Sequence, residues 1–252
     1  MLNKPVAAAV AAVAVLSAAV APARAESVKN VVLVHGAFAE GSGWQGVADI
    51  LGKDGYTVSV VQEPLTSLAG DVAATKRVLD LQQGPTLLVG HSYGGVVITE
   101  AGNAPNVAGL DYIAAFIPDQ GESAVGLLSQ APAANKDMRA TKDDFLYLDP
   151  AAFPADFAAD LPPAEANFMA HSQAMLAKAA GGAPVTTAAW HQKESWALVA
   201  TRDRNINPDL ERGMAKRAGS ETIEVPASHA VYVSKPEDVA RLIERAAKAS
   251  AQ

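Results

Sequence analysis

Residues 86–95 read TLLVGHSYGG, an apolar strand pattern that runs directly into a serine enclosed by glycines. The apolar start of this stretch is typical of a strand buried on both faces of a parallel sheet. A helix pattern begins near Gly95, so Gly90 and Gly94 stand at a sharp turn from strand to helix. In a G-x-S-x-G turn of this kind, the glycines let the backbone hold the serine in a strained conformation with its oxygen exposed. The pattern therefore predicts that Ser92 is a nucleophile.

Strand and helix patterns alternate on both sides of this turn. Similar apolar runs recur at residues 31–34, 57–61, 110–116, 196–200 and 222–225. Helical spacing of apolar residues occurs at residues 44–51, 68–81, 96–104, 208–218 and 236–247. Such alternation implies right-handed crossovers and a sheet covered on both faces. We therefore expect an α/β fold, with a mostly parallel sheet of about six strands and helices on both faces.

One long segment does not follow this alternation. Residues 119–191 are rich in Ala, Pro and Asp and show no strand-helix rhythm. A loop of this length without structure is uncommon in a compact domain, so an inserted cap or lid is the better interpretation. The expected organisation is a core in two parts, residues 26–118 and 192–252, interrupted by this cap over residues 119–191.

The first residues have the features of an export signal. A basic start at Lys4 is followed by an apolar run over 6–21 and then by Ala23-Arg24-Ala25. This order is typical of a secretory signal peptide, and the run is shorter than the roughly 20 apolar residues that span a bilayer. We expect a signal peptide over residues 1–25, cleavage after Ala25, export to the periplasm or medium, and no stable membrane association.

The composition limits the chemistry that the chain can perform. Its 252 residues are 50% hydrophobic and 19% charged, a balance typical of a globular protein. A total of 20 Lys and Arg against 27 Asp and Glu gives a net charge of −7, which disfavours nucleic acid as a partner. Without cysteine, thiolate catalysis, disulfides and cysteine-bound metals are excluded. We expect a small-molecule ligand; the oligomeric state stays open.

A serine hydroxyl needs a base within hydrogen-bond reach, and histidine is the usual one. Of the 5 histidines, His229 follows the last strand pattern, in a loop that leaves the same edge of the sheet as Ser92. We therefore expect His229 to be the base. The remaining histidines are assigned structural or solvated roles: His35, His91, His171 and His191.

Two aspartates can orient this base. Asp203 follows the strand pattern 196–200 and gives the chain order Ser92, Asp203, His229, which is the order of one known class of serine hydrolases. Asp119 follows the strand pattern 110–116 at the same edge of the sheet and is the main rival. The order and the position at a strand end favour Asp203.

The remaining site residues are predicted from the loops around Ser92. Backbone N–H groups of Tyr93, the residue after the nucleophile, and of Ala37, in the loop after the first strand, are the expected oxyanion donors. We prefer Ala37 to Phe38 for the second donor. The expected pocket residues are Phe38, Trp44 and Phe168, although aromatic residues of this kind also pack in cores.

With these residues placed, the chain resembles the α/β-hydrolase superfamily, specifically the small capped branch that includes plant methylesterase-like and hydroxynitrile-lyase-like enzymes. The resemblance covers essentially everything after the expected signal peptide. It implies a triad of Ser92, Asp203 and His229, and a cap inserted after the fourth of the strands. The segments that carry it are Leu33-Val34-His35-Gly36-Ala37, Gly43-Trp44, Gly90-His91-Ser92-Tyr93-Gly94-Gly95, 201–206 and Ser228-His229-Ala230-Val231.

Two departures favour one branch of this superfamily. Hydroxynitrile lyases of the branch carry a lysine after the catalytic histidine and a threonine in the first oxyanion loop. Here Ala230 and Gly36-Ala37 occupy those places, so the cation that stabilises departing cyanide is missing. The resemblance implies a serine hydrolase acting without a cofactor on small, largely apolar carboxylic esters or lactones. The alternatives are a carbon–carbon lyase, a cofactor-free perhydrolase and a non-catalytic binding protein that keeps the fold.

Overall fold

A computed structural model describes residues 1–2 and 28–250, so the expected signal peptide and its cleavage site lie almost wholly outside the described residues. The main sheet has six strands in the order β2-β1-β3-β4-β8-β9, and all of its pairings are parallel. This confirms the predicted α/β fold. The strands are β1 (Asn30–Val34), β2 (Thr57–Val61), β3 (Thr86–His91), β4 (Val107–Ile113), β8 (Ser195–Ala200) and β9 (Glu221–Val225).

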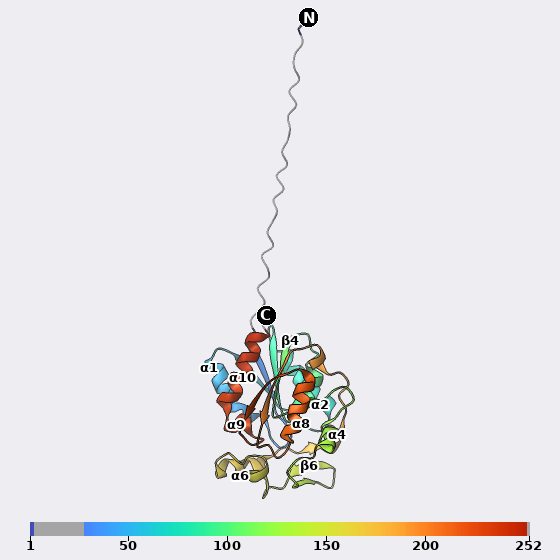
Figure 1. The fold of residues 1–252 in the computed structure, drawn as a ribbon, viewed down its shortest axis with the longest axis vertical. Coiled ribbons are helices and arrows are strands. Elements are labelled where there is room, and N and C mark those ends of the chain that lie inside the picture. Colours follow the sequence, from blue (N-terminus) through green and yellow to red (C-terminus); the bar gives the residue numbers. More distant parts are fainter. Residues whose placement is uncertain (3–27, 251–252) are drawn as a thin grey trace.

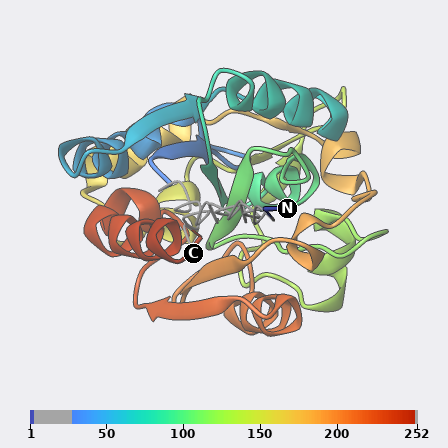
Figure 2. The same cartoon turned by 90° about the horizontal axis from the view of Figure 1, so that it is seen from above.

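Helices cover both faces of this sheet (Figures 1 and 2). One apolar core joins the sheet to α1 (Gln45–Lys53) and α10 (Pro236–Ala249), and the other joins it to α2 (Leu68–Leu79), α3 (Gly94–Ala101) and α8 (Pro208–Ala218). In α10 the buried Val239, Leu242, Ile243 and Ala246 recur at helical spacing, so one face packs on the sheet while the charged face meets water. Two short helices complete the core: η1 (Gly41–Trp44) and α9 (Val231–Ser234).

The burial of each strand follows its place in the sheet. Every residue of β3 is buried because β1 and β4 pair on its two sides and helices cover both faces, whereas the edge strands β2 and β9 are partly exposed. The predicted strand 110–116 is displaced: β4 runs over Val107–Ile113. The reason is Ala114, whose φ of 44° lies in the left-handed region and turns the chain out of the sheet before Phe116.

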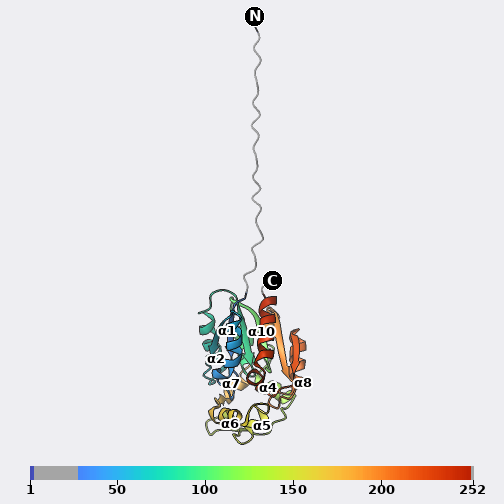
Figure 3. The same ribbon diagram turned by 90° about the vertical axis from the view of Figure 1, so that its left-hand side faces the viewer.

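Much of the segment between β4 and β8 forms a separate layer beyond the carboxyl ends of the strands, with β6 and α6 in it, as Figures 1 and 3 show. It contains a three-stranded antiparallel sheet, which sequence analysis missed. Its strands are only two to four residues long, too short for an alternating pattern to be recognised. The elements of this cap are α4 (Ala124–Gln130), β5 (Met138–Ala140), β6 (Phe145–Leu148), α5 (Phe153–Asp156), α6 (Pro163–Ser172), β7 (Leu176–Ala177) and α7 (Lys178–Gly182); the short helix η2 (Ala189–His191) that follows packs on α3.

Among the described residues, no helix combines the length and apolar character that crossing a membrane requires.

Candidate active site

The turn between β3 and α3 holds Ser92 in the left-handed region, with φ of 55°. Glycines make this turn possible, because a Cβ on Gly94 would lie 2.7 Å from the carbonyl oxygen of His35, and a Cβ on Gly90 would lie 2.6 Å from that of Gly94. A Cβ on Gly36 would come within 2.6 Å of the Ser92 side chain. The glycines of the motif therefore let three stretches of backbone pack closely around the serine.

The structure brings Ser92, His229 and Asp203 into one line of hydrogen bonds. The Ser92 Oγ lies 2.9 Å from His229 Nε2, and His229 Nδ1 lies 2.5 Å from an Asp203 carboxylate oxygen. The three residues come from the ends of β3, β8 and β9, which meet at the same edge of the sheet. The exposed fractions of Ser92, His229 and Asp203 are 7%, 1% and 4%, so the hydrogen bonds form away from bulk water, where they are stronger.

Backbone groups fix the orientation of Asp203. Its Oδ1 accepts hydrogen bonds from the N–H groups of Asn205, at 2.6 Å, and Ile206, at 3.0 Å. This turns Oδ2 toward the imidazole of His229. The loop between β8 and α8 thus presents one oxygen to the base and anchors the other.

A second buried carboxyl lies against Asp203 and was missed by sequence analysis. The Oε2 atom of Glu211, in α8, accepts the Ala200 N–H at 3.3 Å, and its Oε1 atom has no hydrogen-bond partner among the described residues. Burial and the negative charge of Asp203 raise the pKa of Glu211 well above its ordinary value, which favours the neutral carboxyl. The sequence does indicate that Glu211 is buried, because Glu211 shares the apolar face of its helix with Met214 and Ala215.

Two other histidines support the site without joining the line of hydrogen bonds. The His91 ring donates to the backbone carbonyl of His229 at 3.0 Å, and burial lowers the pKa of His91 well below its usual value. His35 accepts the N–H of Glu63 at 3.0 Å and donates from Nδ1 to the carbonyl of Gly36 at 2.9 Å. Burial also lowers the pKa of His35, which keeps the ring neutral as this pattern requires. His91 thus braces the histidine loop and His35 braces the oxyanion loop.

The cap also holds the loop that carries His229. The Ala230 N–H donates to the Phe157 carbonyl at 2.9 Å. The carboxylate of Asp160 accepts hydrogen bonds from the Ser228 N–H, at 3.2 Å, from the Ser228 hydroxyl, and from the Ser234 hydroxyl, at 2.8 Å. Both cap residues lie between α5 and α6.

Two backbone N–H groups next to Ser92 have no acceptor among the described residues: those of Ala37 and Tyr93. The Phe38 N–H, by contrast, donates to the Ala174 carbonyl at 2.8 Å. The donor of Phe38 is therefore occupied, whereas Ala37 and Tyr93 can receive a substrate oxygen. The oxyanion role of Ala37 stays a prediction.

The cavity at Ser92 is small and almost entirely apolar. Its volume is about 60 Å³, and its lining includes Phe38, one of the three predicted pocket residues. The other two predicted residues lie elsewhere. Trp44, the last residue of η1, is wholly buried in the core against Tyr232, with ring centroids 4.7 Å apart. Phe168, on α6, is 70% exposed. The other residues around the cavity come from the cap and the strand ends: Phe116, Ala124, Val125, Leu128, Met138, Leu146, Leu176, Gly181, Asn205 and Ile206.

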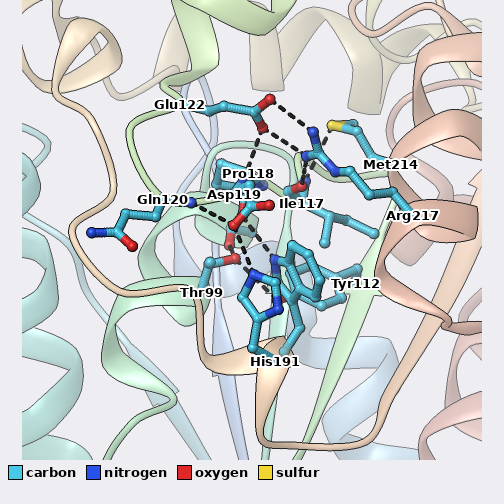
Figure 4. A network of polar contacts seen from close by, with 12 residues as sticks. Thr99, Tyr112, Ile117, Pro118, Asp119, Gln120, Glu122, His191, Met214 and Arg217 are labelled. Atoms are coloured by element: carbon cyan, nitrogen blue, oxygen red, sulfur yellow. Dashed lines mark hydrogen bonds and ion pairs between the residues drawn. The ribbon is translucent and has the colours of Figure 1, made fainter.

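The rival Asp119 is engaged elsewhere, as Figure 4 shows. Its carboxylate lies 2.8 Å from Nε2 of His191, and this hydrogen bond lowers the pKa of Asp119. Next to this pair, Glu122 accepts hydrogen bonds from Arg217. The network ties the start of the cap to η2 and α8 at the surface, so the structure does not bring Asp119 to His229.

Within residues 28–250, no group of three His, Asp or Glu side chains is arranged to hold a metal ion.

Comparisons with known proteins agree with this architecture. A family model described as "Alpha/beta hydrolase family" matches residues 31–242. A carbendazim-hydrolysing esterase from Nocardioides sp. (strain SG-4G) is 34% identical over 116 residues, which are 40% of this chain and 48% of that protein. The match thus spans about half the length of this curated relative.

Solved structures share the fold at lower identity. A pyrethroid hydrolase from Sphingobium faniae JZ-2 is 22% identical with a TM-score of 0.76, covering 88% of this chain and 98% of its own. An extracellular alpha/beta-hydrolase from a Paenibacillus species is 20% identical with a TM-score of 0.74, covering 86% and 98%. Polyneuridine aldehyde esterase is 14% identical with a TM-score of 0.74, covering 86% and 99%. At these identities the similarity establishes the fold.

Proposed function

Since this chain belongs to the alpha/beta hydrolase family, we propose that it is a serine hydrolase that cleaves small, largely apolar carboxylic esters or lactones. The observation that carries the proposal is the buried line of hydrogen bonds from Ser92 through His229 to Asp203. A hydroxyl, a base and an orienting carboxylate in this order are what acyl transfer needs. Two unoccupied backbone donors beside the serine supply the oxyanion site.

The first half of the reaction forms an acyl-enzyme. Ser92 Oγ attacks the ester carbonyl while its proton passes to His229 Nε2, and the carbonyl oxygen takes a negative charge next to the N–H groups of Ala37 and Tyr93. When the tetrahedral intermediate collapses, the bond to the alcohol oxygen breaks. His229 then returns the proton to that oxygen, so a neutral alcohol leaves. Asp203 stabilises the imidazolium throughout.

The second half releases the acid and restores the enzyme. A water molecule gives a proton to His229 and attacks the acyl carbonyl, which again places negative charge at the two backbone donors. Breakdown of this intermediate frees the carboxylic acid, and the proton on His229 returns to Ser92 Oγ. No cofactor takes part in this scheme.

The lining of the cavity supports hydrolysis over carbon–carbon cleavage. Ala230 follows the base, and among the described residues no lysine or arginine lines the cavity at Ser92. A departing cyanide would have no cation beside it there. By their names, one relative hydrolyses carbendazim and another protein of the same fold hydrolyses pyrethroids, which supports small organic substrates here. Perhydrolysis would use the same acyl-enzyme with hydrogen peroxide in place of water.

We further propose that the chain is exported after cleavage following Ala25. The support is the basic, apolar and small-residue order of residues 1–25.

The test of the proposed function is covalent labelling of Ser92. The protein is incubated with an organophosphonate, and its mass is measured together with the turnover of p-nitrophenyl acetate. We expect one adduct on Ser92 and loss of turnover, because only an activated serine reacts readily. Ser92→Ala should take no label, and its turnover should fall by a factor of about 10⁴ or more. Absence of both label and turnover in the unaltered protein would instead indicate a binding protein.

A further inference from the structure

Phe38 lies at the border between the cavity at Ser92 and a larger groove. It lines both spaces, and no other residue is common to their linings in the described part of the chain. Phe38 is 7% exposed and has φ of 64°, and its N–H donates to the Ala174 carbonyl at 2.8 Å. The backbone of Phe38 is therefore held in place, and its side chain forms part of the wall of both spaces.

The cavity at Ser92 is the smaller of the two spaces, about 60 Å³ against about 410 Å³ for the groove, and its lining is mainly apolar. Its size and lining suit a short apolar acyl group, and the larger groove has room for the alcohol part of the ester. Ala37, the expected oxyanion donor, immediately precedes Phe38, so a carbonyl bound at Ala37 lies next to the wall that borders the groove.

The groove on the other side of Phe38 has a volume of about 410 Å³ and an acidic lining. Glu40, Asp49 and Glu165 line it, and none of the three forms an ion pair within the described residues. No lysine, arginine or histidine belongs to this lining. The groove therefore favours a positively charged group.

Two further side chains give the groove the character of a binding site. Tyr232 lines it while wholly buried, and its hydroxyl, which faces Gly43 of the same groove, has no partner among the described residues. Burial and the charge of Glu40 raise the pKa of Tyr232, so the hydroxyl stays protonated. Phe168 presents a 70% exposed ring to the groove, and aromatic faces attract organic cations.

We infer that Phe38 divides an acyl site from an alcohol site, and that the acidic groove binds the alcohol part of esters whose alcohol carries a positive charge. The inference rests on the proposed ester hydrolysis and adds the substrate class. It assigns a short apolar acyl group to the cavity and an organic ammonium group to the groove.

The first experiment compares two acetates of similar shape. Acetylcholine carries a quaternary ammonium group, and 3,3-dimethylbutyl acetate replaces it with a neutral tert-butyl group. We expect kcat/KM to be about fivefold higher for acetylcholine at low ionic strength, since one unscreened charge pair at contact distance gives a preference of that order. The preference should shrink as salt is added. A ratio of one or less would overturn the inference.

Substitutions in the groove provide the second readout. In Asp49→Asn/Glu165→Gln, the ratio of kcat/KM for the cationic over the neutral acetate should fall toward one. Asp54→Asn is the matched control, because Asp54 is an exposed carboxylate at the end of α1 that does not line the groove. It removes one charge and should keep the native ratio. Equal ratios in the native protein and the double variant would contradict the inference.

A third measurement tests on which side of the cavity the alcohol part of the ester binds. Phe38→Ala should raise kcat/KM for 1-naphthylmethyl acetate relative to methyl acetate, because it joins the cavity to the groove. Val125→Trp narrows the cavity from α4 and should lower both rates by the same factor. If Val125→Trp alone changes this ratio, the alcohol lies between α4 and α7 and the inference is wrong. Loss of p-nitrophenyl acetate turnover in the native protein would contradict the proposed hydrolysis itself.

Discussion

At the residue scale, backbone strain lies beside each expected oxyanion donor. Ser92, with φ of 55°, precedes Tyr93, and Phe38, with φ of 64°, follows Ala37. Residues other than glycine rarely adopt such angles, which cost on the order of 1–2 kcal/mol each. The two turns direct the N–H groups of Ala37 and Tyr93 away from regular secondary structure. The strain thus leaves two donors without internal partners at the place where an oxyanion would form.

Replacement of the orienting acid tests the roles of the two aspartates. Asp203→Asn keeps the shape of the side chain but removes the charge that stabilises the imidazolium of His229, so turnover should fall by up to roughly 10⁴-fold. Asp119→Asn removes only the surface contact to His191 and should reduce turnover less than about threefold. Both variants are assayed with p-nitrophenyl acetate. A larger loss in Asp119→Asn than in Asp203→Asn would transfer the role to Asp119.

The buried carboxyl of Glu211 gives a pH-dependent prediction. Its raised pKa favours the neutral form, and loss of this proton as the pH rises would place a second negative charge beside Asp203. Glu211→Gln keeps the size of the side chain with an amide that does not ionise, so turnover should remain near native and extend to higher pH. Glu211→Ala leaves the buried Ala200 N–H without its acceptor at the end of β8 and should lower turnover about tenfold.

The measurement is the pH profile of kcat for the native protein and both Glu211 variants. A merely structural role for Glu211 would shift thermal stability but leave the alkaline limb of the profile in place. Identical alkaline limbs in the native protein and Glu211→Gln would therefore contradict the prediction.

The sequence predicted the residues of the site that a local pattern or chain order defines. Ser92 is marked by its flanking glycines, and Asp203 and His229 by their places after strand patterns. The structure brings these three together in one line of hydrogen bonds. The pattern could not separate Trp44, a core residue, from Phe38, a cavity residue, because both are aromatic residues near one loop. Only three-dimensional packing distinguishes the two.

At the element scale, long periodic segments were predicted well and short ones were not. The predicted strand 57–61 and helix 208–218 coincide with β2 and α8, since apolar periodicity and turn residues mark their ends. The strand at β4 was displaced because the turn at Ala114 depends on the packing of Gly95 against the Phe116 carbonyl. The strands of the cap pair with one another over contacts that no local pattern records.

A buried aspartate in β4 predicts how stability depends on pH. Asp111 is wholly buried, neither carboxylate oxygen has a partner among the described residues, and burial raises its pKa to about 8. Because this pKa lies above that of the unfolded chain, the native state holds a proton that the unfolded state loses. Stability should therefore decrease as pH rises from about 4 to 8, by at most about 1.4 kcal/mol per pH unit, and then level off.

Asp111→Asn isolates this contribution from those of other buried carboxyls. The amide does not ionise, so the free energy of unfolding should vary less with pH, and the variant should be more stable than the native protein at pH 9. Urea unfolding of both proteins at pH 5, 7 and 9 measures the difference. Parallel pH dependences would show that Asp111 is not the group responsible.

At the scale of the whole molecule, one end of the sheet carries the site and the cap covers that end (Figure 3). The two apolar cores on either side of the sheet hold the strand ends in place, and the loops beyond them position Ser92, Asp203 and His229. The parallel architecture could be predicted because it follows from the alternation of elements. The lining of the cavity could not, because cap residues far apart in the sequence build it.

The expected processing of the chain is tested on the full-length protein. N-terminal sequencing of exported material should begin at Glu26-Ser27-Val28, because Ala23-Arg24-Ala25 fits the small-residue preference of signal peptidase. Replacement of Ala25 by a bulky residue, Ala25→Phe, should block this cleavage. Recovery of intact Met1 in the membrane fraction would indicate an uncleaved anchor.

The hydrogen bonds between the cap and the loop that carries His229 couple the position of the cap to that of the base. Phe157 and Asp160 hold both neighbours of His229, Ser228 and Ala230, so lifting this part of the cap would release the base from Ser92. An enzyme opened there would be switched off until it closed again. A substrate that enters without displacing His229 would therefore have to pass another border of the cap.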